Sequence, residues 1–476
     1  MVKNNTSITR QTILTTLPMV KKIHFIGILG AGMSGLAEVM SNNGYQVTGS
    51  DIKDSADAKR LRELGIVVHI GHNFEHVIDT QVVVVSSAIS QDNEELRFAQ
   101  NHSIPIVPRA HILGELMRNT NSIAVAGSHG KTTTTSLIAH VFTQAGLEPS
   151  YVIGGRFMNS HANAKIGSGD YLIAEADESD CSFLHLLPFI AVITNIDNDH
   201  LSHYDFSMEK LKDAFVAFVH KLPFYGVAVI CADDIHLLDL QKRFQRRVVS
   251  YGTHELAHVR LLTINSLDMQ SKFTVSVFGQ EHTFNLQLPG KHNISNALAT
   301  IAVATMVGIP LESISNSLAT FPGLRRRFQT HPPCKVLNGM VDILEDYAHH
   351  PKEIIATLDA AKSAFKNRRL VLVFQPHRFS RTKQLFNDFS IALRNADVLV
   401  ITETYSASEP YDEAGSGKAL FHVIQQSMQD KVHWCPTADD ICDFIYTQSK
   451  SGDYILIFGA GDINKIIPTL QAKHAH

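Results

Sequence analysis

The stretch SIAVAGSHGKTTTT, residues 122–135, decides the fold of this chain. Its first five residues, Ser122–Ala126, have the character of a buried strand, and a run that suits a helix follows the loop. That loop, Gly127–Thr133, has the form of a phosphate cradle, in which backbone N–H groups surround the phosphates. Lys131 would contact the β and γ oxygens of ATP, and the Thr132 hydroxyl would bind Mg²⁺. We therefore predict an α/β domain that binds ATP at this loop.

The loop Gly127–Thr133, named the lysine loop after Lys131, is shorter than the common GxxxxGK[ST] pattern. Val125 stands where the first glycine of that pattern belongs. Gly-Lys-Thr can occur by chance on a surface loop, but the strand before it and the helix after it argue against chance here. All seven loop residues are expected at ATP: Gly127, Ser128, His129, Gly130, Lys131, Thr132 and Thr133.

A second glycine loop lies nearer the amino terminus. Gly30–Gly35 reads GAGMSG, a GxGxxG that follows the expected strand Ile23–Leu29 and precedes a helical run. Such glycines let the backbone approach a diphosphate at the N-terminus of a helix, and Asp51 ends the next strand, where it can meet a ribose hydroxyl. NAD is the usual ligand, and a tight turn without a ligand is the alternative. The motif alone does not decide which nucleotide binds.

Polar and acidic residues follow two further strands in the same block as the lysine loop. They are Glu175, Asp177, Glu178 and Asp180 after residues 171–174, and Asn195, Asp197, Asp199 and His200 after residues 190–194. Acids at the carboxyl ends of parallel strands beside a phosphate loop indicate Mg²⁺ ligands, although a solvated acidic loop explains any single one. His200 would be an unusual Mg²⁺ ligand, since hard cations prefer oxygen, and its position equally suits a base.

Three successive strand ends near the carboxyl terminus carry polar, imidazole and guanidinium groups. These loops are DYAHHP at 346–351, QPHRFSR at 375–381 and TYSASE at 404–409. Ligands of open α/β sheets bind at this edge, so we expect a binding site there. Helix capping explains Asp346 or His350 singly, but not three loops in succession. The arginine run 325–327 suits anion binding as well as a solvated surface.

Composition limits the class of protein. The chain has 42 Lys+Arg and 46 Asp+Glu, a net charge of −4, which excludes the basic bias of a protein that grips nucleic acid. Hydrophobic residues make up 44% of the 476, enough for sizeable cores. The five cysteines contain no CxxC pair, which favours a reducing compartment, and no apolar stretch has the length of a membrane span. We expect a globular cytoplasmic protein.

Short β-rich runs alternate with helix-period stretches from end to end, which is typical of α/β domains with parallel sheets. Polar residues at 118–121 and the Phe-Pro-Gly at 321–323 interrupt this alternation. We predict three domains: 1–119 with the GxGxxG loop, 120–327 with the lysine loop, and 328–476 with the three carboxyl-terminal loops.

Taken together, the motifs resemble those of the Mur ligases of bacterial peptidoglycan synthesis. They are, in order, GxGxxG, GSHGKTTTT, EADESD, TNIDNDH, HNISNALA, GLRRRF, DYAHHP and QPHRFSRT. The resemblance covers the chain after the first ~20 residues. It implies a Rossmann-like UDP-binding domain, a central ATPase domain of the P-loop type, and a Rossmann-like third domain that closes over the substrates.

The resemblance also implies a role for each set of residues. UDP-N-acetylmuramate, rather than NAD, would bind through its UDP at Gly30, Gly32, Ser34, Asp51 and Ser87. ATP would contact the lysine loop together with Asn293, Arg327 and Asp346. Mg²⁺, or Mn²⁺ in its place, would bind Thr132, Glu175 and His200. Muramate and alanine would lie beside Tyr347, His349, His377, Arg378 and Arg381, with Lys131 at the reacting phosphate.

The implied activity is ATP-dependent amide formation between L-alanine and the lactyl carboxylate of UDP-N-acetylmuramate, through an acyl phosphate, by a monomer or weak homodimer. No single general base stands out, and His200, His349 and His377 are candidates. Three alternatives stay open. They are a recycling ligase that attaches a preformed peptide to the same sugar, a nicotinamide-dependent oxidoreductase, and a P-loop ATPase with an appended sensor domain.

Overall fold

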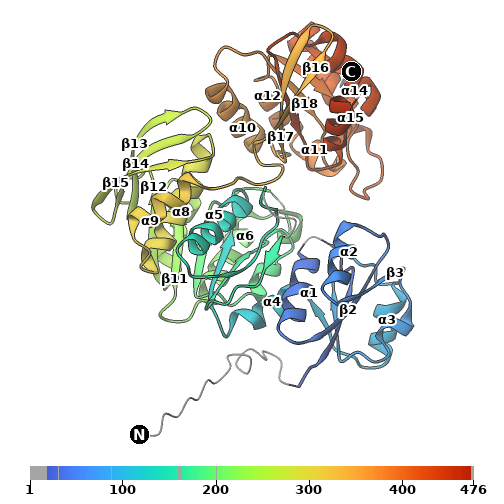
Figure 1. The fold of residues 1–476 in the computed structure, drawn as a ribbon, viewed down its shortest axis with the longest axis vertical. Helices are drawn as coiled ribbons and strands as arrows, with labels where there is room; N and C mark the ends of the chain where they lie inside the picture. The colour runs from blue at the N-terminus through green and yellow to red at the C-terminus, as the bar shows by residue number, and fades with distance from the viewer. Residues whose placement is uncertain (1–18, 31, 87, 159–162, 200, 473–476) are drawn as a thin grey trace.

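The computed structural model describes residues 19–472, apart from 31, 87, 159–162 and 200. Three sheets follow one another along the chain and each is flanked by helices, which confirms the predicted α/β class (Figure 1). The sheets use residues 22–108, 121–286 and 329–458, while the domain boundaries at 119 and 327 stay predictions. Within the described part of the chain, no helix has the length and apolar character that crossing a membrane requires.

The first sheet has five parallel strands in the order β3-β2-β1-β4-β5. Its elements are β1 Lys22–Ile26, α1 Met33–Asn42, β2 Gln46–Asp51, α2 Ala56–Glu63, β3 Val67–Ile70, β4 Val82–Val85, α3 Glu94–Asn101, β5 Ile106–Pro108 and α4 Arg109–Met117. The first strand ends before the predicted Leu29, because Gly27 has a φ of 77° and turns the chain. The GxGxxG loop therefore starts at the carboxyl end of the central strand, where nucleotides bind in this class of sheet.

The second sheet has ten strands in the order β15-β14-β13-β12-β11-β10-β6-β9-β7-β8. The strands are β6 Asn121–Ala126, β7 Ser150–Val152, β8 Ala164–Lys165, β9 Tyr171–Glu175, β10 Ile190–Ile193, β11 Val227–Cys231, β12 Arg247–Gly252, β13 Val259–Leu267, β14 Ser271–Val277 and β15 Gln280–Leu286. The helices are α5 Lys131–Gln144, α6 Met208–His220, α7 Ile235–Leu240, α8 Lys291–Met306 and α9 Leu311–Ala319. Because β6 runs parallel to both β10 and β9, the lysine loop and the two acidic loops leave the sheet at one edge.

The third sheet has the order β16-β17-β21-β18-β19-β20. Its strands are β16 Gln329–Val336, β17 Gly339–Asp346, β18 Leu370–Phe374, β19 Val398–Ile401, β20 Val432–Trp434 and β21 Tyr454–Phe458. Its helices are α10 Pro351–Ala364, α11 Phe379–Gln384, α12 Phe386–Leu393, α13 Gly417–Met428, α14 Ala438–Gln448 and α15 Ile466–Ala472. Strand β16 was not predicted from the sequence, and it contains Pro332 and Pro333. It lies antiparallel at the edge of the sheet, where a missing backbone N–H is tolerated.

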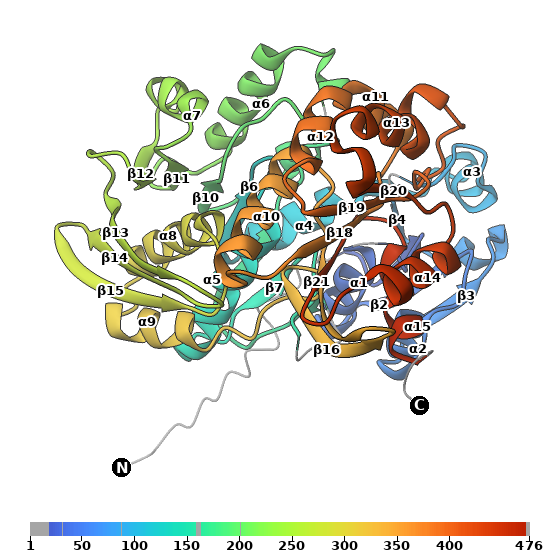
Figure 2. The same ribbon diagram turned by 90° about the horizontal axis from the view of Figure 1, so that it is seen from above.

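One hydrophobic core runs through the first two domains, and the first has a small second cluster around Val83, whereas the third has only clusters of its own, on the two faces of its sheet. Glycines bring the first two domains close together. A Cβ at Gly35 of α1 would lie 2.6 Å from the Cβ of Ala164, and Gly114 of α4 lies against the carbonyl of His185. The third domain approaches through α10, which packs beside α8 (Figure 2). A separate core is what a domain that opens and closes requires.

Candidate active site

The lysine loop connects β6 to α5 and is shaped by two glycines. Gly130 precedes α5 with a φ of 81°, and Gly127 has a φ of 126°. A Cβ at Gly127 would overlap the hydroxyl of Thr194, so only glycine lets the loop close against β10. The side chain of Asn195 fixes the loop, because its oxygen accepts the N–H of His129 at 2.9 Å and its amide donates to the His129 carbonyl at 3.0 Å. The loop thus sets the N-terminus of α5 as an anion site.

Lys131 folds back over this loop. Its Nζ donates to the carbonyl of Gly127 at 2.7 Å and lies 2.8 Å from a carboxylate oxygen of Glu178. Burial by itself would lower the pKa of Lys131, but the charges of Glu178, Asp177 and Glu175 outweigh it and raise that pKa above its ordinary value. The lysine is therefore a fixed positive charge at the phosphate loop.

Two of the three predicted metal ligands lie together. The Thr132 hydroxyl is 3.0 Å from each carboxylate oxygen of Glu175, and the backbone N–H of Gly154 donates to the same carboxylate at 2.7 Å. Hydroxyl and carboxylate oxygens are the hard donors that Mg²⁺ prefers, so this pair fits the predicted ion. His200, the third predicted ligand, lies outside the described residues.

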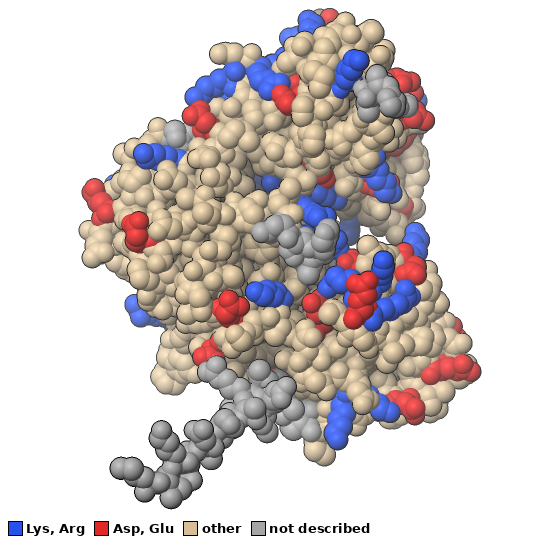
Figure 3. All heavy atoms as spheres, in the orientation of Figure 1, with Lys and Arg blue, Asp and Glu red and all other residues tan. Residues whose placement is uncertain are grey.

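A cavity of about 770 Å³ separates the lysine loop from the third domain. Lys131, Thr132 and Glu175 line one side of it. The opposite side holds all five residues that were predicted for the muramate and alanine end: Tyr347, His349, His377, Arg378 and Arg381. The space-filling view shows a hollow beside the third domain with Lys and Arg side chains at its edge (Figure 3). The folded chain thus brings the phosphate loop and the third-domain loops to one space.

Two imidazoles in this cavity are uncharged at neutral pH. Burial lowers the pKa of His349 to about 4, and burial together with neighbouring His349 and Arg381 lowers the pKa of His377 to about 3. The Nδ1 atom of His349 lies 3.0 Å from the carbonyl oxygen of Tyr347, to which it can only donate. Its Nε2 therefore presents a lone pair that can accept a proton.

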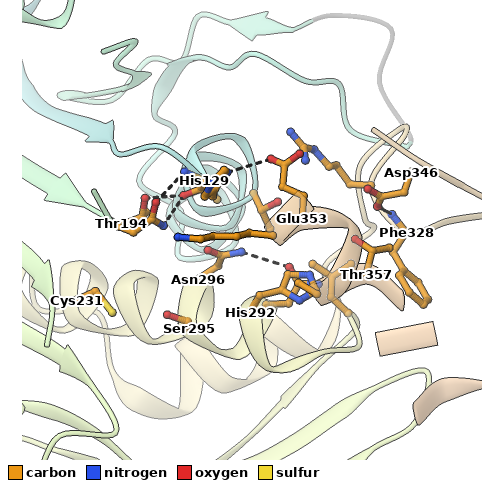
Figure 4. Close-up of a pocket in the computed structure, with 18 of the residues that line it drawn as sticks. His129, Thr194, Cys231, His292, Ser295, Asn296, Phe328, Asp346, Glu353 and Thr357 are labelled. Atoms are coloured by element: carbon orange, nitrogen blue, oxygen red, sulfur yellow. Dashed lines mark hydrogen bonds and ion pairs between the residues drawn. The ribbon is translucent and has the colours of Figure 1, made fainter. Parts of the chain in front are cut away.

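A second cavity, of about 370 Å³, also adjoins the lysine loop (Figure 4). Six of the predicted ATP residues line it: His129, Gly130, Thr133, Asn293, Arg327 and Asp346. Asp346 accepts the N–H groups of Phe328 at 2.7 Å and Ala348 at 2.8 Å. Burial, partly offset by Arg327, raises the pKa of Asp346 to about 6. The surface of this cavity is more apolar than polar, with polar side chains among its lining residues, which is the combination that suits a nucleoside joined to loop-bound phosphates.

Several residues of this second cavity were not predicted from the sequence. Among them are His292, Asn296, Lys352, Glu353 and Thr357. The amide of Asn296 donates to the side chain of Asn293 at 3.3 Å, one turn away on α8, so a helical interpretation of HNISNALA could have found it. No local signal points to Glu353. It reaches His129 from the start of α10, and the two side chains point toward one another (Figure 4).

In the first domain, the glycine loop is held over the end of β2. The carboxylate of Asp51 accepts the N–H of Leu29 at 2.9 Å, and Gly32 precedes α1 with a φ of 75°. A Cβ at Gly32 would lie 2.9 Å from the Nη1 atom of Arg109, a guanidinium beside the loop that the sequence analysis missed. The other predicted residues are Gly30 and Ser34, which flank the same turn, and Ser87, which lies outside the described residues.

Three family models match the chain in succession. They are "Mur ligase family, catalytic domain" at residues 22–121, "Mur ligase middle domain" at 125–304 and "Mur ligase, glutamate ligase domain" at 326–461.

Sequence relatives match over almost the whole length. The UDP-N-acetylmuramate–L-alanine ligase of Methylococcus capsulatus is 46% identical over 95% of this chain and 96% of its own. The ligase of the same name from Nitrosospira multiformis is 47% identical over 95% and 94%.

Two solved structures share this fold over almost the whole length of the chain. The UDP-N-acetylmuramate–alanine ligase of Thermotoga maritima is 30% identical, with a TM-score of 0.79 over 94% of this chain and 98% of its own. A murein peptide ligase of Psychrobacter arcticus is 25% identical, with a TM-score of 0.69 over 94% and 98%.

Proposed function

The chain belongs to the Mur ligase family, and from that premise we propose that it is an ATP-dependent ligase that joins L-alanine to the lactyl carboxylate of UDP-N-acetylmuramate. This reaction is a step of peptidoglycan precursor synthesis. One structural observation supports it above all. The lysine loop of the second domain and the imidazole and guanidinium groups of the third line one cavity.

The chemistry requires that arrangement. A carboxylate is a poor acyl donor, so its oxygen first attacks the γ-phosphorus of ATP, which forms an acyl phosphate and releases ADP. The amine of alanine then attacks the acyl carbon, and inorganic phosphate leaves as the amide bond forms. The first step needs phosphates and carboxylate held in line, and the second needs the amine held against the acyl carbon.

The residues of the lysine loop would serve the first step. Lys131 and Arg327 offset the charge on the phosphates. Thr132 and Glu175 would hold Mg²⁺, which supplies further neutralisation of phosphate charge when it is bound. Asn293 and Asp346 line the smaller cavity, where the nucleoside of ATP would lie.

The third domain would serve the second step. Arg378 and Arg381 line the cavity and would present guanidinium groups to the carboxylates of the substrates. His349 is neutral, and because its Nδ1 donates to the Tyr347 carbonyl its Nε2 carries the lone pair, which makes it the best-supported of the three candidate bases for the alanine ammonium. His377 remains a second candidate, and its ring lies 5.9 Å from that of His349.

The first domain would hold the UDP through Gly30, Gly32, Ser34, Asp51 and Ser87. A nicotinamide-dependent oxidoreductase would use the same glycine loop, but that function does not account for the lysine loop and its cavity. Calorimetric titrations with UDP-N-acetylmuramate and with NAD⁺ separate the two. Saturable binding of NAD⁺ without binding of the UDP-sugar would overturn our assignment.

Phosphate release from ATP tests the whole proposal. We expect release that depends on both UDP-N-acetylmuramate and L-alanine, with an amide product of matching mass. Release that requires a preformed peptide instead of L-alanine would favour the recycling ligase, and release without any sugar would favour a simple ATPase. The cytoplasmic location and the assembly state, monomer or weak homodimer, stay predictions.

A further inference from the structure

His129, Asp197 and His350 come from three separate loops and converge where the third domain meets the second. One ligand atom from each lies within 4.8 Å of the other two. We propose that these three residues bind a divalent transition metal ion of the Zn²⁺ or Co²⁺ type, which clamps the third domain onto the second. None of the three belongs to the Mg²⁺ site of Thr132, Glu175 and His200, although Asp197 lies in one of the two acidic loops that follow β9 and β10.

The donor set determines the class of ion. Two imidazoles and one carboxylate match the borderline character of Zn²⁺ and Co²⁺, whereas Mg²⁺ prefers oxygen ligands alone. Three protein ligands leave one position of a tetrahedral ion for water.

The ring of His129 is oriented as a metal-bound imidazole usually is. Its Nε2 lies 3.1 Å from the Oδ2 atom of Asp197, and its Nδ1 lies 3.4 Å from a carboxylate oxygen of Glu353. A ligating histidine commonly donates its other ring N–H to a carboxylate, which fixes the ring and makes the ligand more basic. Glu353 is already placed for that task. Burial by itself would lower the pKa of His129, but Asp197 and Glu353 outweigh it and raise that pKa to about 9, so Nε2 releases a proton to solvent when the ion binds.

His350 supplies the unpartnered atom. Only 3% of this residue is exposed, and its Nε2 has no hydrogen-bond partner among the described residues. Its ring centre lies 4.8 Å from that of His129. The Nδ1 atom accepts the N–H of Lys352 at 3.4 Å, a long contact that would be given up when the proton moves to Nδ1 and Nε2 binds the ion. A bound ion would thus satisfy a buried polar atom.

In this structure Lys352 forms an ion pair with Asp197, the third proposed metal ligand. The Nζ atom of Lys352 lies 2.8 Å from the same Oδ2 atom of Asp197 that faces His129. The Lys352 side chain is 65% exposed, so it can swing into solvent when an ion takes its place. Lys352 is therefore a competitor of the metal.

The ligands join two domains that have separate cores. His129 and Asp197 follow β6 and β10 of the second domain, and His350 precedes α10 of the third. An ion bound by all three holds the third domain against the lysine loop, which would slow the opening that product release requires.

Cobalt titration tests the site without nucleotide or sugar, so its result does not depend on the ligase activity. Protein prepared without a polyhistidine tag is titrated with Co²⁺ in excess Mg²⁺, and visible absorption reports four- or five-coordinate Co²⁺. We expect one such site per chain. His350→Ala and Asp197→Asn should weaken it by more than about tenfold. Lys352→Ala should strengthen it, a gain that misfolding cannot imitate.

His422→Ala, an exposed histidine of α13, is the matched control and should change nothing. Equal Co²⁺ binding by the wild type and His350→Ala would overturn the site, as would displacement of Co²⁺ by Mg²⁺. Small-angle scattering tests the clamp, because Zn²⁺ should reduce the radius of gyration of the wild type but not of His350→Ala. Bound metal with an unchanged radius would overturn the clamp.

Discussion

The ammonium of Lys131 lies 2.8 Å from a carboxylate oxygen of Glu178, and only 1% of the Glu178 side chain is exposed. A phosphate oxygen that approaches the lysine must therefore compete with a buried carboxylate. The pairing keeps the lysine charged and positioned over the loop before nucleotide arrives. Breaking this ion pair also costs free energy when nucleotide binds.

Lys131→Ala should lower kcat/KM by about 100- to 1,000-fold, because the lost contact strengthens as charge develops on the transferred phosphoryl group. Steady-state phosphate release measures it. Lys242→Ala, which removes an exposed lysine far from the loop in sequence, should behave as wild type. Near-normal kcat/KM in a folded Lys131→Ala protein would contradict the assignment.

Glu178→Gln should tighten the binding of a non-hydrolysable ATP analogue several-fold, since the phosphates no longer compete with a carboxylate. Without nucleotide the variant should melt at a lower temperature, because the buried lysine loses its counter-charge. Thermal melts with and without the analogue measure both effects. The same ligand-induced rise in Tm for variant and wild type would argue that the two groups do not compete.

Glu175→Gln and His200→Ala should each raise the Mg²⁺ or Mn²⁺ concentration needed for half-maximal activity, and both should leave UDP-sugar affinity intact. Each variant would lose one of the proposed metal ligands. Asp180→Asn, an exposed acid near Glu175 in the sequence, serves as the control. Measuring activity against Mg²⁺ and Mn²⁺ concentration tests this prediction.

The competing role of His200, as a base for the amine, makes a different prediction. Acyl phosphate would still form and only the amine step would fail. Borohydride reduction traps the acyl phosphate. Normal trapping in His200→Ala, at unchanged metal dependence, would remove His200 from the metal site.

Domain closure should follow ligand binding. In this structure Lys352 meets Asp197 at 2.8 Å, and Arg381 approaches Asp199 at 3.8 Å, so the third domain lies against the second. Small-angle scattering should show compaction toward this arrangement when an ATP analogue and UDP-N-acetylmuramate are added together. Closure would be contradicted if saturating ligands left the radius of gyration unchanged and the measured value stayed above the radius of this structure.

The first domain should lose stability in acid through Glu95. This fully buried carboxylate accepts hydrogen bonds from Ser50, His72 and His76. Burial alone would raise the pKa of Glu95, but His24 above all, with Ser50 and His76, lowers it from 4.5 to about 2. The ionised form therefore stabilises the fold above pH 4.5, by about 3 kcal/mol, and this contribution is lost as pH falls toward 2.

Urea unfolding at pH 7 and pH 4 measures this dependence. Glu95→Gln should be less stable than wild type at pH 7, and the difference should shrink at pH 4. Glu94→Gln, at the exposed neighbouring position on α3, provides the matched control. A stability difference that does not depend on pH would show that Glu95 acts through packing alone.

Local sequence was enough to find the lysine loop, the glycine loop and the acids after β9 and β10. Each of these belongs to a strand–loop–helix unit, and such a unit is specified by residues close together in the chain. Because β6, β9 and β10 run parallel, the edge at which their loops meet could also be predicted. Edge strand β16 could not, since its two prolines obscure the alternation of a strand.

Only the tertiary structure decided which distant side chains meet. Glu353 contacts His129 across 224 residues, and no local pattern marks it as part of the phosphate site. The low pKa of His349 and the raised pKa of Asp346 arise in the same way, from burial between domains. Sequence by itself determined the loops and their chemistry, because backbone geometry near a strand end is local. Which side chains those loops contact depended on how the second and third domains pack together. The surfaces that meet in this packing are formed by segments far apart in the chain.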